Sequence, residues 1–168
     1  MDKNVVLLIG MPGCGKTTIG LEVSKRLGYD FYDMDNYIEE ISNSTVKELF
    51  SESEDYFRDF ESRACKELSK LAKKTIISSG GGVVKRKSNI ECFKANGIII
   101  FIDRPVEEIL KDVDVASRPL LKDGKEKIYN LYNERYDLYN NYCDYKIVNN
   151  ENLEDIVDKV IDIIKTCE

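Results

Sequence analysis

The sequence predicts a three-layer α/β domain in which helices cover both faces of a parallel β-sheet. About five short apolar runs alternate with segments of helical periodicity, which is the pattern of consecutive βαβ units. The first apolar run is joined to the first helical segment by a glycine-rich loop, as in doubly wound parallel sheets. No internal repeat, low-complexity stretch or long linker interrupts the 168 residues. We therefore expect residues 1–168 to form a single domain.

The composition is that of an ordinary globular protein, and it argues against several classes of partner. The chain has 25 basic and 31 acidic residues, so its formal net charge of −6 argues against a dedicated nucleic-acid binder. No apolar run is long enough to span a bilayer, and the N-terminus lacks the pattern of a signal peptide. We therefore expect a cytoplasmic protein that binds neither nucleic acid nor a membrane.

The residues available for chemistry are also restricted. The chain has no histidine, which excludes Ser-His-Asp and Cys-His catalysis and metal binding through imidazole. Its five cysteines are an odd number without C-x-x-C spacing, so we expect neither a disulfide framework nor a zinc site. Any general base must therefore be a carboxylate, a lysine, a tyrosine or a cysteine.

The strand predicted at 5–9 leads into the motif Gly-Met-Pro-Gly-Cys-Gly-Lys-Thr at 10–17. The motif fits G-x-x-x-x-G-K-[ST], the P-loop pattern, and a helix with a stop at Gly28 follows it. The backbone N–H groups of such a loop and of the helix N-terminus surround a polyphosphate. Lys16 can then reach the β- and γ-phosphates, and Thr17 can offer its hydroxyl to Mg²⁺. We predict a site for a nucleoside triphosphate.

Cys14 lies inside this motif, between two glycines and beside Lys16. A helix N-terminus next to a cation makes a thiol reactive. One interpretation is that alkylation of Cys14 blocks nucleotide binding. The alternative is that Cys14 is a small loop residue that stands in for serine or alanine.

Two acids end the next predicted strand, which contains Phe31 and Tyr32. Ligands of parallel α/β sheets bind at the carboxyl ends of the strands. Since side chains alternate along a strand, Asp33 and Asp35 should lie on the same side. We expect both carboxylates to face the P-loop, although a solvated pair of loop acids is the alternative.

Further polar positions follow the later elements. A short helix is predicted at 36–41, Thr45 and Glu48 form a candidate capping box, and a longer amphipathic helix begins near Ser53. Arg58 lies at the edge of its apolar stripe, where an arginine usually pairs with acids such as Glu54 or Glu61. The strand at 75–79 ends in three glycines at 80–82, whose bare backbone can touch a ligand or can form a flexible turn.

The second half of the chain completes the pattern. A helix is expected at about 87–95, a central strand at 97–102 and a helix whose first turn contains Pro105. Residues 111–125 are charged and lack periodicity, which predicts a lid that carries Arg118, although Arg118 can also be an ordinary loop arginine. In the helix at 125–142, Arg135 shares a face with leucines and needs an anionic partner. A strand at 145–148 and an amphipathic helix from 153 close the domain.

The helix at 125–142 also carries a ridge of four tyrosines: Tyr129, Tyr132, Tyr136 and Tyr139. Tyrosines among basic residues can stack on nucleic-acid bases. Acidic residues interrupt any positive surface on this helix, so we interpret the ridge as packing against the rest of the domain.

These positions together indicate a type of reaction. The chain has no N-K-x-D segment of a switch GTPase and is short for a motor ATPase. Arg58 and Arg135 have no phosphate role, and a guanidinium grips a carboxylate through two parallel hydrogen bonds. Asp35 can accept a hydrogen bond from a hydroxyl. The residues therefore favour phosphoryl transfer to a small polyhydroxy carboxylate.

The chain resembles the shikimate kinase family over essentially its whole length. The resemblance rests on five segments in the family's order: the P-loop at 10–17, Asp-Met-Asp at 33–35, Phe57-Arg58 with Glu61, Gly-Gly-Gly-Val-Val at 80–84, and Arg-Pro-Leu-Leu at 118–121 with Glu134-Arg135 and Leu138-Tyr139. It implies that the γ-phosphate of MgATP is transferred to the 3-hydroxyl of shikimate, a step toward chorismate and the aromatic amino acids.

The resemblance also implies roles for individual residues. Catalysis would rest on Lys16, Asp35 and Arg118. ATP would contact Gly13, Cys14, Gly15, Lys16, Thr17, Thr18 and Arg118. Mg²⁺ would be held by Thr17 and, through water, by Asp33. Shikimate would be bound by Asp35, Arg58, Gly81, Gly82 and Arg135.

The implied fold is of the nucleoside-monophosphate-kinase type, with strand order 2-3-1-4-5. An acceptor-binding segment is expected at about 34–62 and the lid at 111–125, in a monomer. One residue departs from the family pattern, because Lys111 stands where an arginine near the adenine is common, and a lysine stacks less well on a base. Two alternatives stay open: another small-molecule P-loop kinase, for example for gluconate, and a catalytically silent nucleotide-binding regulator.

Overall fold

The computed structural model describes residues 2–116 and 121–168, with side chains described at 2–112 and 124–168. Its centre is a five-stranded parallel sheet in the order β2-β3-β1-β4-β5. The strands are β1 (Val5–Ile9), β2 (Asp30–Asp33), β3 (Thr75–Ser78), β4 (Gly97–Asp103) and β5 (Tyr145–Val148). The α/β class and the strand order expected from the sequence are confirmed.

The inner strands are apolar throughout because both faces of the sheet are covered. Every residue of β1 and β3 is buried, as is all of β4 except Asp103 at its end. The edge strands β2 and β5 bury less of their length. Parallel strands need crossover helices on the faces of the sheet, so their residues lose contact with water on both sides.

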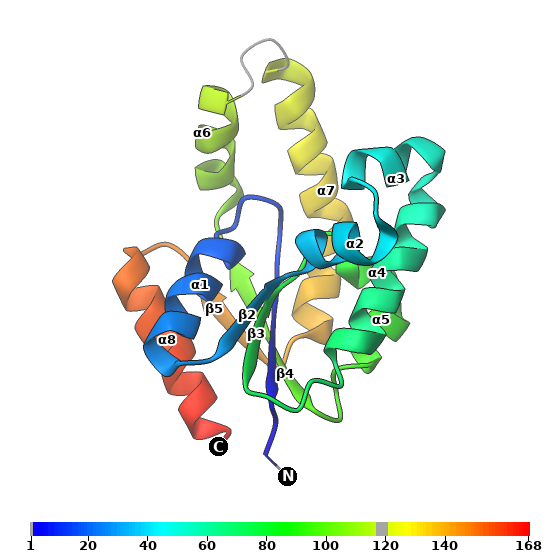
Figure 1. Ribbon diagram of the computed structural model, residues 1–168. Helices are drawn as coiled ribbons and strands as arrows, with labels where there is room; N and C mark the ends of the chain where they lie inside the picture. Colours follow the sequence, from blue (N-terminus) through cyan, green and yellow to red (C-terminus); the bar gives the residue numbers. More distant parts are fainter. Residues whose placement is uncertain (1, 117–120) are drawn as a thin grey trace.

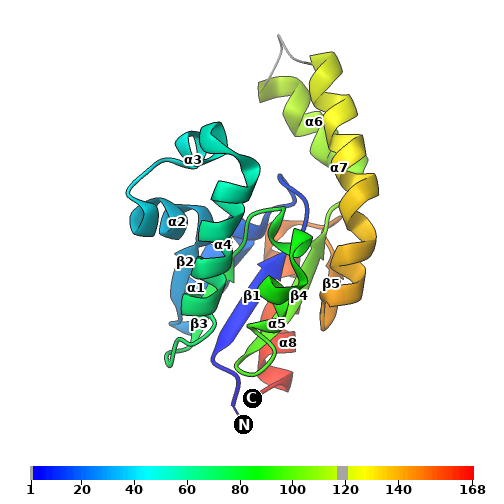
Figure 2. The same ribbon diagram turned by 90° about the vertical axis from the view of Figure 1, so that its right-hand side faces the viewer.

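Helices form the two outer layers (Figures 1 and 2). One face carries α1 (Lys16–Leu27) and α8 (Leu153–Thr166), which pack against each other. The other face carries α4 (Glu54–Leu68), α5 (Lys87–Glu91) and the C-terminal half of α7 (Leu121–Tyr142). The expected apolar stripe of α8 is buried from Ile156 to Ile164, whereas its first member, Leu153, is exposed. Within the described part of the chain, no helix is both long enough and apolar enough to cross a membrane.

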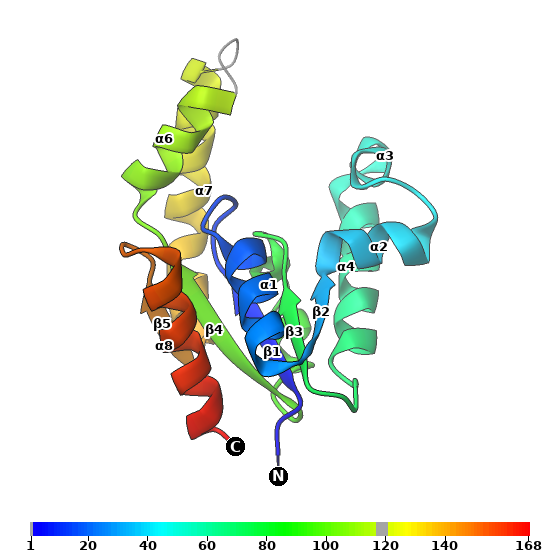
Figure 3. The ribbon, with the colours of Figure 1, turned by 60° about the vertical axis from the view of Figure 1, so that its left-hand side comes forward.

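Two arms extend beyond the carboxyl ends of the strands, on either side of the loop that follows β1 (Figure 3). One arm consists of α2 (Met34–Ser42), α3 (Val46–Glu52) and the first turns of α4. The other consists of α6 (Val106–Ala116) and the first turns of α7. The loops after β1, β2 and β3 therefore open between the arms, while both chain termini lie at the opposite end of the sheet.

Local signals in the sequence set several helix ends. The capping box before α3 is present, because Glu48 N donates to Thr45 Oγ1 at 3.1 Å and Thr45 N donates to Glu48 Oε2 at 3.3 Å. Ser53 caps α4, because its Oγ accepts a hydrogen bond from Tyr56 N at 2.9 Å. Gly28 ends α1 with a φ angle of 69°, which favours glycine. These boundaries confirm the predictions.

Other boundaries were wrong. α2 begins at Met34 rather than Asn36, and α5 ends at Glu91 rather than near 95. The segment at 111–125 was expected to lack regular structure, yet 111–116 belong to α6 and 121–125 to α7. Exposed charges do not oppose a helix, and a helix tolerates a single glycine such as Gly124. Arg118 lies outside the described residues, so its expected position in a lid is not tested.

Candidate active site

The loop after β1 encloses the side chain of Lys16. Gly13 and Gly15 have φ angles of 81° and 100°, a conformation that favours glycine. Lys16 is the first residue of α1, and its Nζ donates to the carbonyl oxygens of Gly10 and Met11 at 2.7 and 3.0 Å. Only 7% of Lys16 is exposed. A buried cation thus sits at the N-terminus of a helix, where anions are stabilised.

Cys14 does not occupy an accessible position in this loop. Its side chain is fully buried, and Sγ accepts a hydrogen bond from Lys16 Nζ at 3.5 Å. A Cβ atom added to Gly10 would lie 2.8 Å from this sulfur, so the thiol is in close contact with backbone. This burial favours the alternative that Cys14 is a small packing residue of the loop.

Three polar side chains meet at the start of α1. Thr17 Oγ1 lies 3.0 Å from Ser78 Oγ and donates to Asp33 Oδ2 at 3.4 Å. The parallel register brings them together, since Asp33 pairs with Ser78 across β2 and β3. All three offer oxygen atoms, which are the ligands that Mg²⁺ prefers. Sequence reasoning did not assign Ser78 to this cluster, because only the strand register places it there.

Asp35 reaches the same region by a different route than expected. Asp33 is the N-cap of α2, with its Oδ1 accepting from Asn36 N at 3.1 Å, so Asp35 lies in the first helical turn and not on a strand. The alternation argument for Asp35 was therefore wrong. Both acids still line the cavity at the P-loop. Burial raises the pKa of Asp35, the charge of Asp33 raises it further, and Lys16 opposes the rise.

Arg58 is buried among carboxylates and aromatic rings. Only 7% of it is exposed, and its Nη1 donates to Glu61 Oε1 at 2.9 Å. Its Nε and Nη2 each lie 3.4 Å from Glu54 Oε1. The rings of Phe50 and Phe57 lie 5.7 and 5.2 Å from the guanidinium carbon. The ion pairs with Glu54 and Glu61 that were expected for a surface arginine are thus present, but Arg58 is buried.

Glu61 is the buried member of these pairs. Its Oε2 has no hydrogen-bond partner among the described residues. Burial raises the pKa of this carboxyl, whereas Arg58 and, more weakly, Arg135 lower it. Glu61 therefore lies within electrostatic reach of both arginines. Arg135 itself is only 7% exposed, and its Nε also lacks a hydrogen-bond partner within the described structure.

The loop of three glycines after β3 passes between these groups. A Cβ atom on Gly80 would lie 3.2 Å from Asp35 Oδ1, and one on Gly81 would lie 2.6 Å from Cδ of Pro12. The Gly81 carbonyl accepts a hydrogen bond from the hydroxyl of Tyr139, which is fully buried on α7. The glycines therefore allow contact with the P-loop and with Asp35, and Tyr139 holds the loop from the opposite side.

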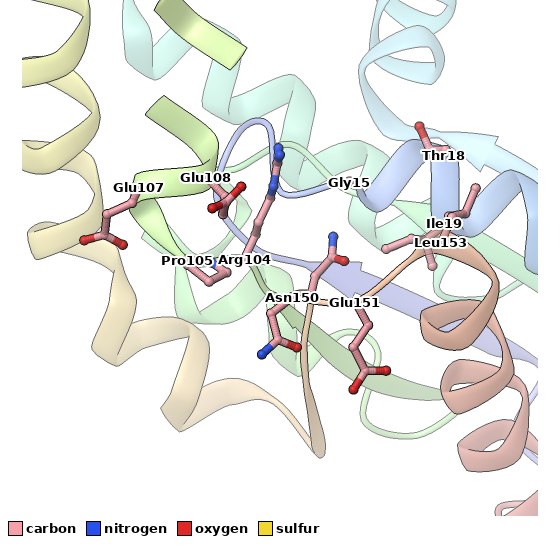
Figure 4. Close-up of a pocket in the computed structure, with 11 residues that line it drawn as sticks. Gly15, Thr18, Ile19, Arg104, Pro105, Glu107, Glu108, Asn150, Glu151 and Leu153 are labelled. Atoms are coloured by element: carbon pink, nitrogen blue, oxygen red, sulfur yellow. The ribbon is translucent and has the colours of Figure 1, made fainter. Parts of the chain in front are cut away.

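Most of these residues line one cavity of about 540 Å³. It is lined by Pro12, Gly13, Gly15, Lys16, Thr17, Thr18, Asp33, Asp35, Ser79, Gly80, Gly81, Arg104 and Asp112. A second cavity of about 610 Å³ adjoins it between the start of α6 and the loop from β5 to α8 (Figure 4). Gly15 and Thr18 line both cavities, so the two are continuous at the N-terminus of α1.

The comparisons with known proteins agree with this geometry. A sequence profile described as "Shikimate kinase" matches residues 12–165. The chain is 57% identical to the shikimate kinase of Clostridium beijerinckii over 162 residues, covering 96% of this chain and 95% of that protein. It is 55% identical to the shikimate kinase of Clostridium botulinum strain Alaska E43, covering 96% of this chain and 98% of the other.

The chain belongs to the shikimate kinase family. Among solved structures, a shikimate kinase from Acinetobacter baumannii in complex with shikimate superposes with a TM-score of 0.87 at 31% identity, covering 98% of this chain and 94% of the other. The protein is therefore an enzyme of the shikimate pathway, and ATP is its co-substrate. This decides against the gluconate kinase and the silent regulator that the sequence left open.

The structure of this shikimate kinase brings together most of the predicted site residues. Gly13, Gly15, Lys16, Thr17, Thr18, Asp33, Asp35 and Gly81 line the cavity at the P-loop. Gly82 lies next to the guanidinium of Arg58. The positive charges of Arg58 and Arg135 both lower the pKa of the Glu61 carboxyl. Cys14 is buried behind the loop. The roles of Ser78, Tyr139 and Arg104 were missed, because each depends on contacts between distant segments.

Proposed function

We propose that the residues of this site bind ATP, Mg²⁺ and shikimate, and that they transfer the γ-phosphate of ATP to the 3-hydroxyl of shikimate. The observation that carries the assignment is the position of Asp35, which shares one cavity with the P-loop and lies next to the glycine loop that covers Arg58. Phosphate donor and hydroxyl acceptor then meet at the carboxyl ends of β1, β2 and β3.

The nucleotide phosphates bind in the loop from Gly13 to Thr18. Nζ of Lys16 exchanges its two carbonyl partners for phosphate oxygens, which carry a full negative charge and make stronger hydrogen bonds with an ammonium. The N–H groups at the start of α1 add their partial positive charge. Cys14 is part of the loop around the phosphates: its backbone N–H donates to the Met11 carbonyl oxygen at 3.1 Å, and its side chain packs inward.

Thr17 and Asp33 would hold Mg²⁺, with Asp33 acting through a bound water. A hydroxyl and a carboxylate are a suitable oxygen donor set for this ion, which keeps several waters and binds nucleotide phosphates. When bound, the ion supplies neutralisation of the charge that develops on the phosphate oxygens. The separation of 3.4 Å between the Thr17 and Asp33 oxygens supports a shared site for the pair.

Asp35 acts on the acceptor. Its carboxylate accepts the proton of the 3-hydroxyl while the hydroxyl oxygen forms a bond to the γ-phosphorus and the bond from this phosphorus to ADP breaks. The products are ADP and shikimate 3-phosphate. Since burial and Asp33 raise the pKa of Asp35, its carboxylate is a better proton acceptor than an exposed aspartate.

Arg58 and Arg135 bind the carboxylate of shikimate, with backbone contacts from Gly81 and Gly82. Both arginines are buried, and each therefore needs an anion. Glu61 is the buried carboxylate that acts on both arginines, and the carboxylate of shikimate is the anion that we place beside it. In this proposal the segment 34–62 binds the acceptor. The segment 111–125, which carries Arg118, closes over the phosphates as a lid. We further propose a monomer that acts in the cytoplasm.

The test is ADP release from MgATP with shikimate, quinate, gluconate or no acceptor, measured for the wild type and for Arg58→Ala. Turnover that requires shikimate supports the reaction. A large loss of this turnover in Arg58→Ala supports the binding of the shikimate carboxylate by Arg58. Turnover with gluconate, or ADP release that ignores every acceptor, contradicts the proposal. Thermal unfolding of the variant shows whether it is folded under the assay conditions.

A further inference from the structure

Lys85 is a cation that the roles described above leave unused. It ends the short 3₁₀-helix η1 (Val83–Lys85), which follows the loop of three glycines. Its Nζ forms ion pairs with two carboxylates, at 2.5 Å from Glu54 Oε1 on α4 and at 3.9 Å from Glu134 Oε1 on α7. Lys85 therefore joins the two helices that carry the buried arginines of the proposed acceptor site.

Glu54 shares its carboxylate between Lys85 and Arg58. A single oxygen, Oε1, lies 2.5 Å from Lys85 Nζ and 3.4 Å from both Nε and Nη2 of Arg58. Hydrogen bonds between an ammonium or guanidinium and a carboxylate are usually about 2.7–2.9 Å long, so the contacts with Arg58 are the weak ones. The hydrogen bond from Lys85 lowers the pKa of Glu54, so this carboxylate is ionised at neutral pH.

The Nε and Nη2 atoms of Arg58 form the edge that Glu61 does not use. Nη1 donates to Glu61 Oε1 at 2.9 Å, and the backbone of Gly82 lies against the guanidinium. A guanidinium binds a carboxylate through two parallel hydrogen bonds from one edge. Glu54 occupies the Nε–Nη2 edge in the structure. A substrate carboxylate that binds this edge therefore has to displace Glu54.

Burial decides which of the two carboxylates can move away from Arg58. The Glu61 side chain is 1% exposed, so a Glu61 carboxylate without Arg58 would be a buried charge without its partner. The Glu54 side chain is 49% exposed, and water solvates it when it leaves the guanidinium. Lys85 is already in contact with Glu54 and can keep it after the move.

We propose that Glu54 and Lys85 are positioning residues for the acceptor: the carboxylate of shikimate displaces Glu54 from the Nε–Nη2 edge of Arg58, and Lys85 holds the displaced Glu54. Glu54 then competes with the substrate for Arg58, and Lys85 weakens this competition. The inference rests on the proposed binding of the shikimate carboxylate by Arg58. It adds a competing carboxylate of the enzyme itself, which sets the affinity for the acceptor.

The experiment measures the dissociation constant of shikimate by calorimetry, without nucleotide, for the wild type, Glu54→Gln, Lys85→Met and the double variant. We expect Glu54→Gln to bind shikimate about three- to tenfold more tightly, because the competing charge is gone. Lys85→Met should weaken binding by about threefold or more, since Glu54 then stays on Arg58. In the Glu54→Gln background, Lys85→Met should change the dissociation constant by less than about twofold.

Two controls separate this effect from general changes in charge or folding. Lys87→Met removes a nearby lysine that is 67% exposed and pairs with Glu91 within α5, so its shikimate affinity should stay within about twofold of the wild type. The dissociation constant of ADP should be the same in all variants, because none of them alters the P-loop. In steady-state kinetics, the changes at Glu54 and Lys85 should appear in KM for shikimate rather than in kcat.

Three outcomes overturn the proposal. Weaker shikimate binding by Glu54→Gln would mean that Glu54 supports Arg58 instead of competing with the substrate. An equal loss from Lys85→Met in both backgrounds would mean that Lys85 acts on the substrate without Glu54. Unchanged shikimate affinity in both single variants would mean that Glu54 stays in place when the substrate binds.

Arg58→Ala distinguishes these outcomes from a failure of the proposed function. If this variant binds shikimate as tightly as the wild type, the assignment of the substrate carboxylate to Arg58 is wrong, and the present inference is wrong with it. If it binds shikimate weakly while Glu54→Gln fails to tighten binding, Arg58 keeps its role and only the competition by Glu54 is rejected.

Discussion

Gly82 lies directly against the guanidinium of Arg58, and a Cβ atom built on Gly82 would approach Arg58 Nη2 to 2.3 Å. A side chain at this position of the loop after β3 would therefore displace the guanidinium of Arg58, which extends from α4. The contact places this loop and the acceptor-binding helix α4 at one site.

The first prediction is that Gly82→Ala acts through Arg58. The added methyl group forces the guanidinium from its position, so KM for shikimate should rise by about tenfold or more while KM for ATP changes little. Steady-state kinetics with each substrate varied in turn measure this. A double-mutant cycle supplies the control, since Gly82→Ala should have little further effect in the Arg58→Ala background. Additive effects in the cycle would show that the contact is irrelevant.

The second prediction separates activity from stability at Asp35. Asp35→Asn should lower kcat by about 10² to 10⁴, because the acceptor proton loses its base. The same change should raise the unfolding temperature at pH 7. The folded state holds the proton of Asp35 more tightly than the unfolded state, so the ionised carboxylate destabilises the fold above its raised pKa.

The pH dependence of the stability difference between Asp35→Asn and the wild type is the control for this prediction. As the pH falls through the raised pKa of Asp35, the wild-type carboxyl becomes neutral and the stability advantage of Asp35→Asn should disappear. Thermal unfolding of both proteins across this range measures the difference. A variant that is less stable than the wild type at pH 7 would contradict the argument.

The third prediction compares the two carboxylates that bind Arg58. Side-chain exposure is 1% for Glu61 and 49% for Glu54. Glu61→Ala should lower the free energy of unfolding by about 3 kcal/mol, because it removes the buried carboxylate that accepts a hydrogen bond from Arg58 and leaves a cavity beside the guanidinium. Glu54→Ala should change it by about 1 kcal/mol or less. Denaturant titration measures both variants, and equal losses would refute the role given to burial.

The fourth prediction concerns Tyr139 on α7. Tyr139→Phe removes the donor to the Gly81 carbonyl and should destabilise the fold by about 1–3 kcal/mol. KM for shikimate should rise, since the loop that contacts the substrate loses its support. Tyr129→Phe is the matched control, because Tyr129 is an exposed tyrosine on the same helix. If both variants have the same KM, Tyr139 has no part in positioning the loop.

The fifth prediction follows from the burial of Cys14. Iodoacetamide should first label the partly exposed cysteines, Cys92, Cys143 and Cys167, without loss of activity. Cys14 should react only when the protein unfolds, and mass spectrometry of digested samples identifies the labelled positions. Rapid labelling of Cys14 in the folded enzyme, with loss of ATP binding, would instead support the interpretation that alkylation of Cys14 blocks nucleotide binding.

Local patterns predicted the elements well. Continuous apolar runs marked β1, β3 and β4, and the caps at Thr45, Ser53 and Gly28 marked helix ends. Such signals involve residues a few positions apart, so they act before the chain folds. The prediction was wrong at 111–125, where charge and a glycine were taken as loop signals although the flanking residues are helical.

The sequence by itself determined the α/β class, the P-loop and the set of charged residues that serve a kinase site. Only the tertiary structure decided which of these charges meet. It placed Asp35 on a helix, joined Ser78 to Thr17 through the strand register, buried Arg58 against Gly82 and brought Arg104 to the second cavity. The physical reason is distance along the chain, because contacts between loops of different strands depend on how the whole sheet packs.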